Sequence, residues 1–185
     1  MDSLRGQLLI ASAGLLDPNF ARTVVLVAAH GDEGTLGLIL NREMSLPIRQ
    51  VWSQVNESHC LRDENVRQGG PVGGSLMAIH DQRPMANILI ADDLYLATEL
   101  ADMERLIGSA EGRVLFYIGH SGWGPGQLER ELADGSWLVL PATSDHVFGD
   151  HESVALWQET MIQVGRGQML SIMPIKHPPE DPRAN

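Results

Sequence analysis

The chain has 185 residues, of which 43% are hydrophobic and 20% charged, a composition typical of one soluble globular domain. Its formal net charge is -11, and its 13 basic residues are spread singly along the sequence, which disfavours direct binding to nucleic acid. No apolar run approaches the roughly 20 residues that span a bilayer, and the single cysteine, Cys60, excludes an internal disulfide and fits a reducing compartment, so we expect a cytoplasmic protein without a membrane segment.

The first predicted elements are strands. Residues 7–11 form an apolar strand, and Asp17-Pro18 has the form of a helix start, so a short helical turn through Phe20 is expected. Residues 23–30 and 35–40 are apolar and rich in β-branched side chains, and turn-forming residues 31–34 separate them. This pattern predicts a hairpin buried in the core.

The middle of the sequence mixes helices with short strands. Apolar residues at Ile48, Val51, Trp52 and Val55 form one stripe of an amphipathic helix within 45–57. Short strands are expected at 66–68, 75–80, 87–91 and 94–97, because Gly, Pro and Asp separate these apolar runs. A second helix follows from about 100 and ends before Gly112, and 114–118 is a buried strand.

The last third begins with a glycine-rich connector at 119–126 that leads into a helix at about 127–134, closed by Gly135. A strand at 136–140 and a helix from about 154 to Gly165 complete the predicted elements. We therefore expect one α+β domain over residues 1–172, and the Pro-rich composition of 173–185 predicts a disordered tail.

The segment 119–129, GHSGWGPGQLE, is the most unusual part of the sequence. A strand that runs through glycines into a helix can aim backbone N–H groups at an anion, so a phosphate or carboxylate cradle is one interpretation. The other is a tight connection that lets Trp123 pack closely. No Lys or Arg lies within the loop, which favours the second interpretation.

The same segment resembles a nucleophile elbow, in which Ser121 would attack an ester or amide. His146 or His151 could complete a serine hydrolase. Trp123, however, stands where the elbow requires a small residue for the close strand-helix crossing. A hydrolase is therefore the alternative function.

A cluster of potential metal ligands, Asp145, His146, Asp150, His151 and Glu152, has no specific metal-binding spacing. A solvated loop before a helix explains it equally well. Cys60 beside His59 could be an exposed thiol of lowered pKa, or an ordinary free cysteine. We expect no metal site and no cofactor.

Three segments together resemble the AlgH/YqgE family of bacterial proteins. They are Gly6 to Arg42, with Asp-Pro-x-Phe and Gly-Leu-x-x-Asn-Arg; GGPV at 69–72; and GHSGWGPGQLERELADGSW at 119–137. Glu43 departs from the proline that members usually carry after Asn-Arg. The resemblance implies an α+β fold with a mixed, bifurcated β-sheet, a small barrel-like part and flanking helices, and it implies no defined activity; some members are labelled transcriptional regulators.

The leading functional hypothesis is a non-enzymatic, regulatory module that binds a small molecule or a protein partner, with an indirect role in transcription as one form of it. Polar residues and glycines that the core does not need gather in three loops, which are expected to converge. Arg42 would face an anion, His120 and Gln127 would hydrogen-bond, and Trp123 would stack or plug the core. The predicted binding residues are Asn41, Arg42, Gly69, Gly70, Pro71, Gly119, His120, Gly122, Trp123, Gly126 and Gln127.

Overall fold

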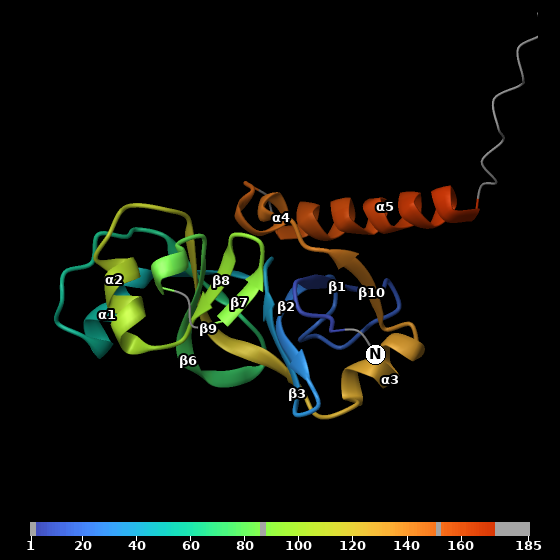
Figure 1. Ribbon diagram of the computed structural model, residues 1–185, viewed down its shortest axis with the longest axis horizontal. Coiled ribbons are helices and arrows are strands. Elements are labelled where there is room, and N and C mark those ends of the chain that lie inside the picture. The colour runs from blue at the N-terminus through green and yellow to red at the C-terminus, as the bar shows by residue number, and fades with distance from the viewer. Residues whose placement is uncertain (1–2, 86–87, 151–152, 173–185) are drawn as a thin grey trace, which may run out of the picture.

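The computed structural model describes residues 3–85, 88–150 and 153–172 as an α+β body built on a branched sheet (Figure 1). The strands are β1 (Gln7–Ala11), β2 (Val24–Gly31), β3 (Gly34–Ile39), β4 (Glu43–Pro47), β5 (Asn65–Gln68), β6 (Val72–His80), β7 (Ile88–Ala91), β8 (Leu94–Ala97), β9 (Val114–Trp123) and β10 (Trp137–Pro141). The helices are α1 (Ile48–Val55), α2 (Leu100–Ile107), α3 (Gln127–Ala133), α4 (Ser144–Phe148) and α5 (Ser153–Ile172), with a 3-10 turn at Arg83–Met85.

Strand β9 joins the two halves of the sheet. The hydrogen-bonded path runs β10-β1-β2-β3-β9-β6-β8-β7, and every neighbouring pair along it is antiparallel. β5 pairs with β9 in parallel at Tyr117 and Ile118, on a branch that also carries β4. The predicted mixed, bifurcated sheet is therefore confirmed.

The expected closure of part of the sheet into a barrel is wrong. Within the residues that the structure covers, β10 pairs only with β1 and β7 only with β8, so the ends of the path do not meet. Closing a barrel requires one continuous ladder of tilted strands. Here the ladder branches at β9 instead, because β9 gives part of one edge to β3 and part to β5.

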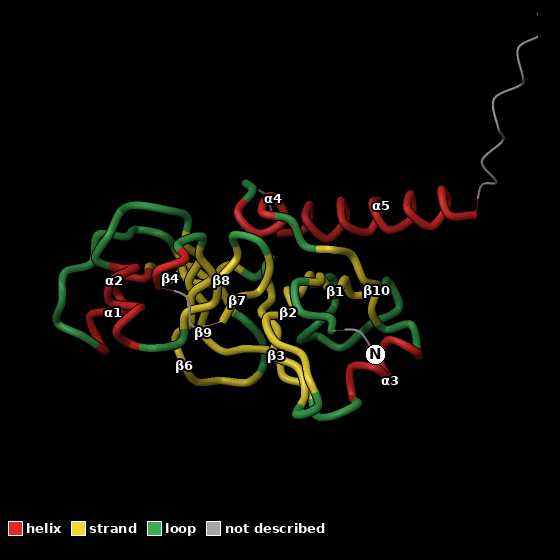
Figure 2. Tube along the Cα trace, in the orientation of Figure 1, coloured by secondary structure: helices red, strands yellow, loops and turns green. Residues whose placement is uncertain are grey.

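Side chains of the described residues form three hydrophobic cores around this sheet. The central core is filled from both half-sheets, α4 and α5. Helices α1 and α2 lie at one end of the molecule and α3 at the other (Figures 1 and 2). Along β1, Leu8 and Ile10 enter the central core, whereas Leu9 and Ala11 enter the core beneath α3. Burial on both faces explains why the first strands are continuously apolar rather than alternating.

The predicted early strands, the hairpin, the first two helices and the strand near residue 137 are confirmed, with small shifts in their bounds. Around Asp17-Pro18 the structure has a turn at 18–22 rather than a regular helix. The first amphipathic helix begins at Ile48 rather than near residue 45, because Pro47 is the extended residue before the helix, with φ -62° and ψ 139°, and the preceding residues pair as β4.

Three expectations for the second half are corrected. Residues 119–123 continue β9 instead of forming a glycine connector, because Ser121, Gly122 and Trp123 pair with β3. The acidic segment near 145 is the short helix α4 rather than a loop, since Thr143 and His146 form a capping box. Helix α5 continues beyond Gly165 to Ile172.

The tail at 173–185 and His151 lie outside the described residues. Among the described helices, none combines the length and the apolarity that crossing a membrane requires.

Candidate functional site

The three segments expected to form a common surface converge where β9 branches. Ile39 N–H donates to the Gly69 carbonyl at 2.9 Å, and Gln68 N–H donates to the Arg42 carbonyl at 2.8 Å. Gly69 N–H in turn donates to the Ile118 carbonyl at 3.0 Å. The ends of β3, β5 and the middle of β9 are thus tied together by backbone hydrogen bonds.

The glycines at this junction allow backbone to touch backbone. A Cβ on Gly69 would lie 2.2 Å from the Gly119 carbonyl oxygen, and one on Gly70 would lie 2.3 Å from the carbonyl carbon of His120. Gly119 also has φ +72°, which favours glycine. Gly69, Gly70 and Gly119 therefore serve close packing.

Asn41 and Arg42 hold the turn at 18–22 against the sheet. The Asn41 side chain accepts from Val24 N–H at 2.9 Å and donates to the Arg22 carbonyl at 2.9 Å. Arg42 Nη2 donates to the Pro18 carbonyl at 3.1 Å and to that of Ala21 at 3.4 Å. The guanidinium expected to face an anion is thus engaged by backbone carbonyls.

Ser121 is sealed inside the junction. Its side chain has no exposed surface, and its hydroxyl donates to the Gly69 carbonyl at 3.1 Å. His146, the expected partner in a hydrolase, hydrogen-bonds to Thr143 and Gln163 instead. Because Ser121 lies in a strand rather than on a strand-to-helix turn, the nucleophile-elbow geometry is absent at this residue.

The remaining predicted residues lie along the second half of β9 and beyond it. Trp123 is buried beneath α3, where its indole N–H donates to Glu131 at 2.9 Å, so it is a core plug. The Gln127 side chain accepts from Gly124 N–H and donates to the Glu131 carboxylate. Gly126 is the residue before α3 and has φ +68°. Pro71 and Gly122 are exposed, and His120 is half-buried.

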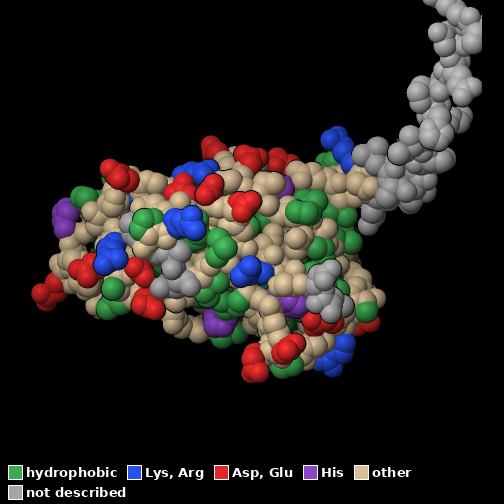
Figure 3. Space-filling view, viewed as in Figure 1, with side chains coloured by type: hydrophobic (Ala, Val, Ile, Leu, Met, Phe, Trp, Pro, Cys, Tyr) green, Lys and Arg blue, Asp and Glu red, His purple; other side chains and the backbone are tan. Residues whose placement is uncertain are grey.

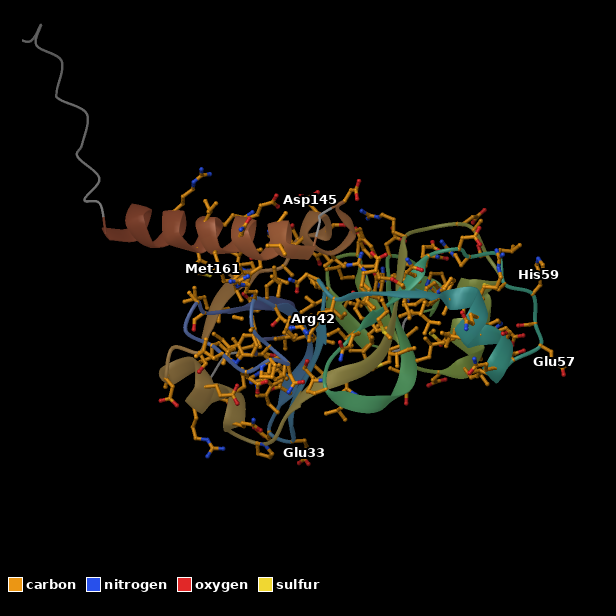
Figure 4. All side chains as sticks on the ribbon, turned by 180° about the vertical axis from the view of Figure 1, so that it is seen from behind. Glu33, Arg42, Glu57, His59, Asp145 and Met161 are labelled. Carbon is orange, nitrogen blue, oxygen red and sulfur yellow. The ribbon has the colours of Figure 1, made fainter. Side chains whose placement is uncertain are left out.

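A small polar pocket opens beside the junction, between the β3–β4 connection, β5 and the helices α4 and α5. Its volume is about 20 Å³, which exceeds the roughly 10–15 Å³ that one water molecule needs. In Figure 4, Arg42 lies near the middle of the molecule and Asp145 lies above it, and their chain neighbours Asn41 and His146 line the pocket. The full lining, which we call the junction pocket, is Leu40, Asn41, Glu43, Arg67, His146, Val147, Gly149 and Leu156.

Arg67 is the basic residue of the junction pocket, and it is half-buried. Its Nη1 donates to the Leu40 carbonyl, while Nε and Nη2 have no hydrogen-bond partner among the described residues. Within the same residues, no carboxylate lies within 4.0 Å of the guanidinium, and Glu43 at the exposed rim accepts from Asn65 instead. One edge of a half-buried cation is therefore left open to the pocket.

Tyr117 stands next to Arg67 in the parallel β5–β9 ladder. It is fully buried in the central core, which also contains three pocket residues, Leu40, Val147 and Leu156. Its hydroxyl has no partner among the described residues. Burial raises the pKa of Tyr117 to about 12, against the opposing charge of Arg67, so the phenol stays protonated and can donate a hydrogen bond.

His146 forms a fixed wall of the pocket. Its Nδ1 accepts from Thr143 N–H at 3.1 Å, and its Nε2 lies 3.0 Å from the Gln163 amide oxygen. Both ring nitrogens are therefore engaged by the protein itself. Arg67 is the one Lys or Arg side chain among the described residues that line the pocket.

Larger hollows lie elsewhere in the described part of the molecule. One of about 550 Å³ lies beside Trp52 and Cys60, one of about 560 Å³ beside Trp157, and one of about 320 Å³ beside the His30–Glu129 pair. The Cys60 thiol donates to the Arg62 carbonyl at 3.3 Å. In the part of the chain that is described, no three His, Cys, Asp or Glu side chains are grouped to hold a metal.

Sequence reasoning missed Arg67 and Tyr117. Arg67 follows the buried Val66 in a four-residue strand, and one charged residue in so short a run gives no functional signal. Tyr117 sits within an apolar strand that reads as core. Only the parallel pairing of β5 with β9, between segments 50 residues apart, brings the two side chains together.

Acidic and basic side chains are interspersed on the face seen in Figure 3, and that face carries no broad basic patch. This distribution agrees with the scattered arginines and the net charge of -11.

Comparison with known proteins gives consistent matches along the chain. Residues 8–168 match the AlgH-like family profile. A UPF0301 protein of Shewanella loihica is 37% identical over 175 residues, which covers 89% of this chain and 93% of the relative. A UPF0301 protein of Myxococcus xanthus is 35% identical over 179 residues, which covers 94% and 97%.

Two solved structures share the fold. The solution structure of the AlgH protein from Pseudomonas aeruginosa matches with a TM-score of 0.72 at 25% identity, covering 95% of this chain and 96% of that one. A crystal structure of a protein from Corynebacterium diphtheriae matches with a TM-score of 0.71 at 23% identity, covering 88% and 87%.

Proposed function

The chain belongs to the AlgH-like family of bacterial proteins, and the region that matches the family contains the whole junction pocket. We propose that the protein is a cytoplasmic, non-enzymatic module that binds a small molecule in this pocket. The observation that carries this proposal is the Nε–Nη2 edge of Arg67, which lines the pocket and has no hydrogen-bond partner among the described residues. The buried hydroxyl of Tyr117, the neighbour of Arg67 in the β5–β9 ladder, also has no partner among them. A buried polar group without a partner costs about 1–3 kcal/mol, and a bound ligand recovers that cost.

A binding role fits the rigidity of the surroundings. Backbone hydrogen bonds from three segments fix the junction, and Asn41 on the pocket wall is held at both its amide atoms. A ligand that meets a preorganised site loses little affinity to ordering the protein. A regulatory effect, including an indirect one on transcription, would act through a partner that distinguishes the ligand-bound from the ligand-free form.

Native mass spectrometry of the protein purified gently from its own organism tests the proposal. We expect an excess mass that is lost on denaturation and that the Arg67→Met variant does not carry. The matched control is Arg49→Met, which removes the same charge from an exposed arginine paired with Asp63, outside the junction pocket. It should keep the excess mass.

A ligand that Arg67→Met retains would contradict the pocket assignment. A clean protein mass, together with capture of a partner protein whose binding does not depend on Arg67, would contradict the small-molecule role. Thermal unfolding of each variant shows whether a lost ligand reflects a lost contact or a lost fold.

A further inference from the structure

We infer that the ligand of the junction pocket is the carboxylate of a small organic acid, bound by Arg67 and Tyr117. This inference rests on the proposed function and names the chemistry of its ligand. Four features of the pocket carry it: the orientation of the guanidinium, the position of the phenol, the size and walls of the pocket, and the charge at its rim.

The guanidinium presents the edge that suits a carboxylate. Nη1 is held by the Leu40 carbonyl, which leaves Nε–H and an Nη2–H pointing in parallel. Two parallel N–H donors match the two oxygens of a planar carboxylate, and such bidentate pairs are among the strongest hydrogen bonds in proteins. The bond to Leu40 also fixes the direction in which this edge points.

Tyr117 is a further donor next to the pocket, behind the residues that line it. Its position beside Arg67 in the ladder places both side chains on the same face of the sheet, because paired residues of neighbouring strands project to one side. The phenol has no acceptor among the residues described, and it remains protonated at neutral pH. A carboxylate oxygen is the acceptor that both donors lack.

The size of the junction pocket and the residues on its wall favour a small planar group attached to an apolar chain. The volume of about 20 Å³ is little more than one water molecule needs, so the pocket admits at most the carboxylate group of an acid. Leu40, Val147 and Leu156 form an apolar part of the wall, against which the carbon atoms of an acid can pack.

Negative charge at the mouth of the pocket favours binding of a carboxylate over binding of a phosphate. Glu43 is exposed at the mouth of the pocket, and the chain as a whole carries -11. Repulsion by these charges grows with ligand charge, so a monoanion is penalised less than a dianion. The single cation Arg67 balances one negative charge.

Titrations of the full chain, followed by ¹H–¹⁵N NMR, test the inference with propionate and inorganic phosphate as probes. We expect saturable propionate shifts at residues lining the pocket, and phosphate binding that is at least about tenfold weaker. Arg67→Met should lower propionate affinity by about tenfold or more, and Tyr117→Phe by about fivefold, the effect of one hydrogen bond. Arg49→Met should bind as the unaltered chain does.

Propionate that binds Arg67→Met equally well, or phosphate that binds as tightly as propionate, overturns the inference. If Arg67→Met does not fold, Tyr117→Phe decides the matter, because it removes one oxygen atom and keeps the ring. A capped glutamate amide that binds more tightly than propionate overturns the assignment to a free acid, because a partner's side chain is then the better ligand. Absence of saturable propionate binding, with an Arg67-dependent excess mass in the native spectrum, overturns the carboxylate and leaves the proposed function standing.

Discussion

The buried Arg62 and the half-buried Arg67 differ in how many of their donors the protein uses. Arg62 is 5% exposed and donates to the carbonyls of Leu106, Glu111 and Gly112, so its donors are used up by the protein itself. Arg67 keeps one edge without a partner among the described residues. Arg62 therefore stabilises the fold, whereas Arg67 keeps donors that a ligand can use.

Replacement of Arg62 by lysine should therefore destabilise the folded protein. The planar guanidinium of Arg62 donates to three backbone carbonyls, and the single ammonium group of a lysine cannot reach all three. Some of these carbonyls would then be buried without a hydrogen-bond donor. We expect Arg62→Lys to lower the free energy of unfolding by about 3 kcal/mol. Urea denaturation measures the loss, and Arg49→Lys, an exposed control, should change stability little.

The Asp81–Arg113 pair predicts an acid-sensitive contribution to stability. Burial acts to raise the pKa of Asp81, but hydrogen bonds and the charge of Arg113 outweigh it and hold this pKa below its ordinary value of 3.8. A carboxylate with a lowered pKa stabilises the fold above 3.8, and this contribution is lost as the pH falls through the folded-state value.

We therefore expect Asp81→Asn to be less stable than the unaltered chain at pH 7, and the difference to shrink below the unperturbed carboxyl pKa of about 3.9. Thermal melts across the acid range give this comparison. A difference that stays constant down to the lowest pH would contradict the assignment.

Ser121 gives a direct test of the alternative enzyme. With its hydroxyl buried and bound to the Gly69 carbonyl, a fluorophosphonate probe should not label the protein. Ser121→Ala should cost about 1 kcal/mol, the worth of one hydrogen bond. Labelling of the folded protein that Ser121→Ala abolishes would show instead that Ser121 is a nucleophile.

At the scale of elements, β9 determines the architecture. Its first half pairs with β6 and β5, and its second half pairs with β3. The apolar run at 114–118 identifies the first half from sequence. The second half resembles a turn in sequence because it contains glycines, although one of them, Gly119, allows the backbone of Gly70 and Val72 to approach β9 closely.

Gly69 and Gly73 provide a matched pair for this close approach. A Cβ at Gly69 would meet backbone at 2.2 Å, whereas a Cβ at Gly73 meets nothing within 4 Å. We expect Gly69→Ala to destabilise the protein by about 3 kcal/mol or more, because backbone must shift, and Gly73→Ala to be nearly neutral. Equal stabilities of the two variants in urea unfolding would show that the junction is not tightly packed.

Much of this architecture follows from local sequence patterns. The hairpin at 24–39, the amphipathic helices α1 and α2, and the strand at 137–141 obey hydrophobic periodicity, so their positions are predictable. β4 and α4 are short, and pairing or capping by residues outside them stabilises them, so periodicity alone does not identify them. Gly165 and Gly167 do not end α5, because each glycine within a helix costs only about 1 kcal/mol.

Sequence reasoning located the segments that meet at the junction, but of the predicted binding residues only Asn41 lines the junction pocket. The convergence of 41–42, 69–71 and 119–122 follows from the three motif segments, and the structure brings these segments together. The side chains with unused donors are Arg67 and Tyr117, because Asn41 and Arg42 use theirs in hydrogen bonds to the backbone. Which polar groups remain unpartnered depends on tertiary contacts, and no local pattern encodes these.

At the scale of the whole molecule, the branched sheet places one polar pocket where the two half-sheets and the helices α4 and α5 meet. The central core draws side chains from both half-sheets, so a ligand at its edge touches elements distant in sequence (Figures 1 and 4). A ligand bound there would stabilise the folded state by mass action, and this makes binding measurable as a rise in melting temperature.

We propose that the junction pocket holds a ligand against Arg67 and Tyr117. A crystal structure of the protein purified gently from its own organism tests this most directly, because it shows both the ligand and its position. We expect electron density for a small acid within hydrogen-bonding distance of Arg67 Nε and Nη2 and of the Tyr117 hydroxyl. A pocket that contains only ordered water, with a ligand bound instead in the hollow beside Cys60 or Trp157, would contradict the account.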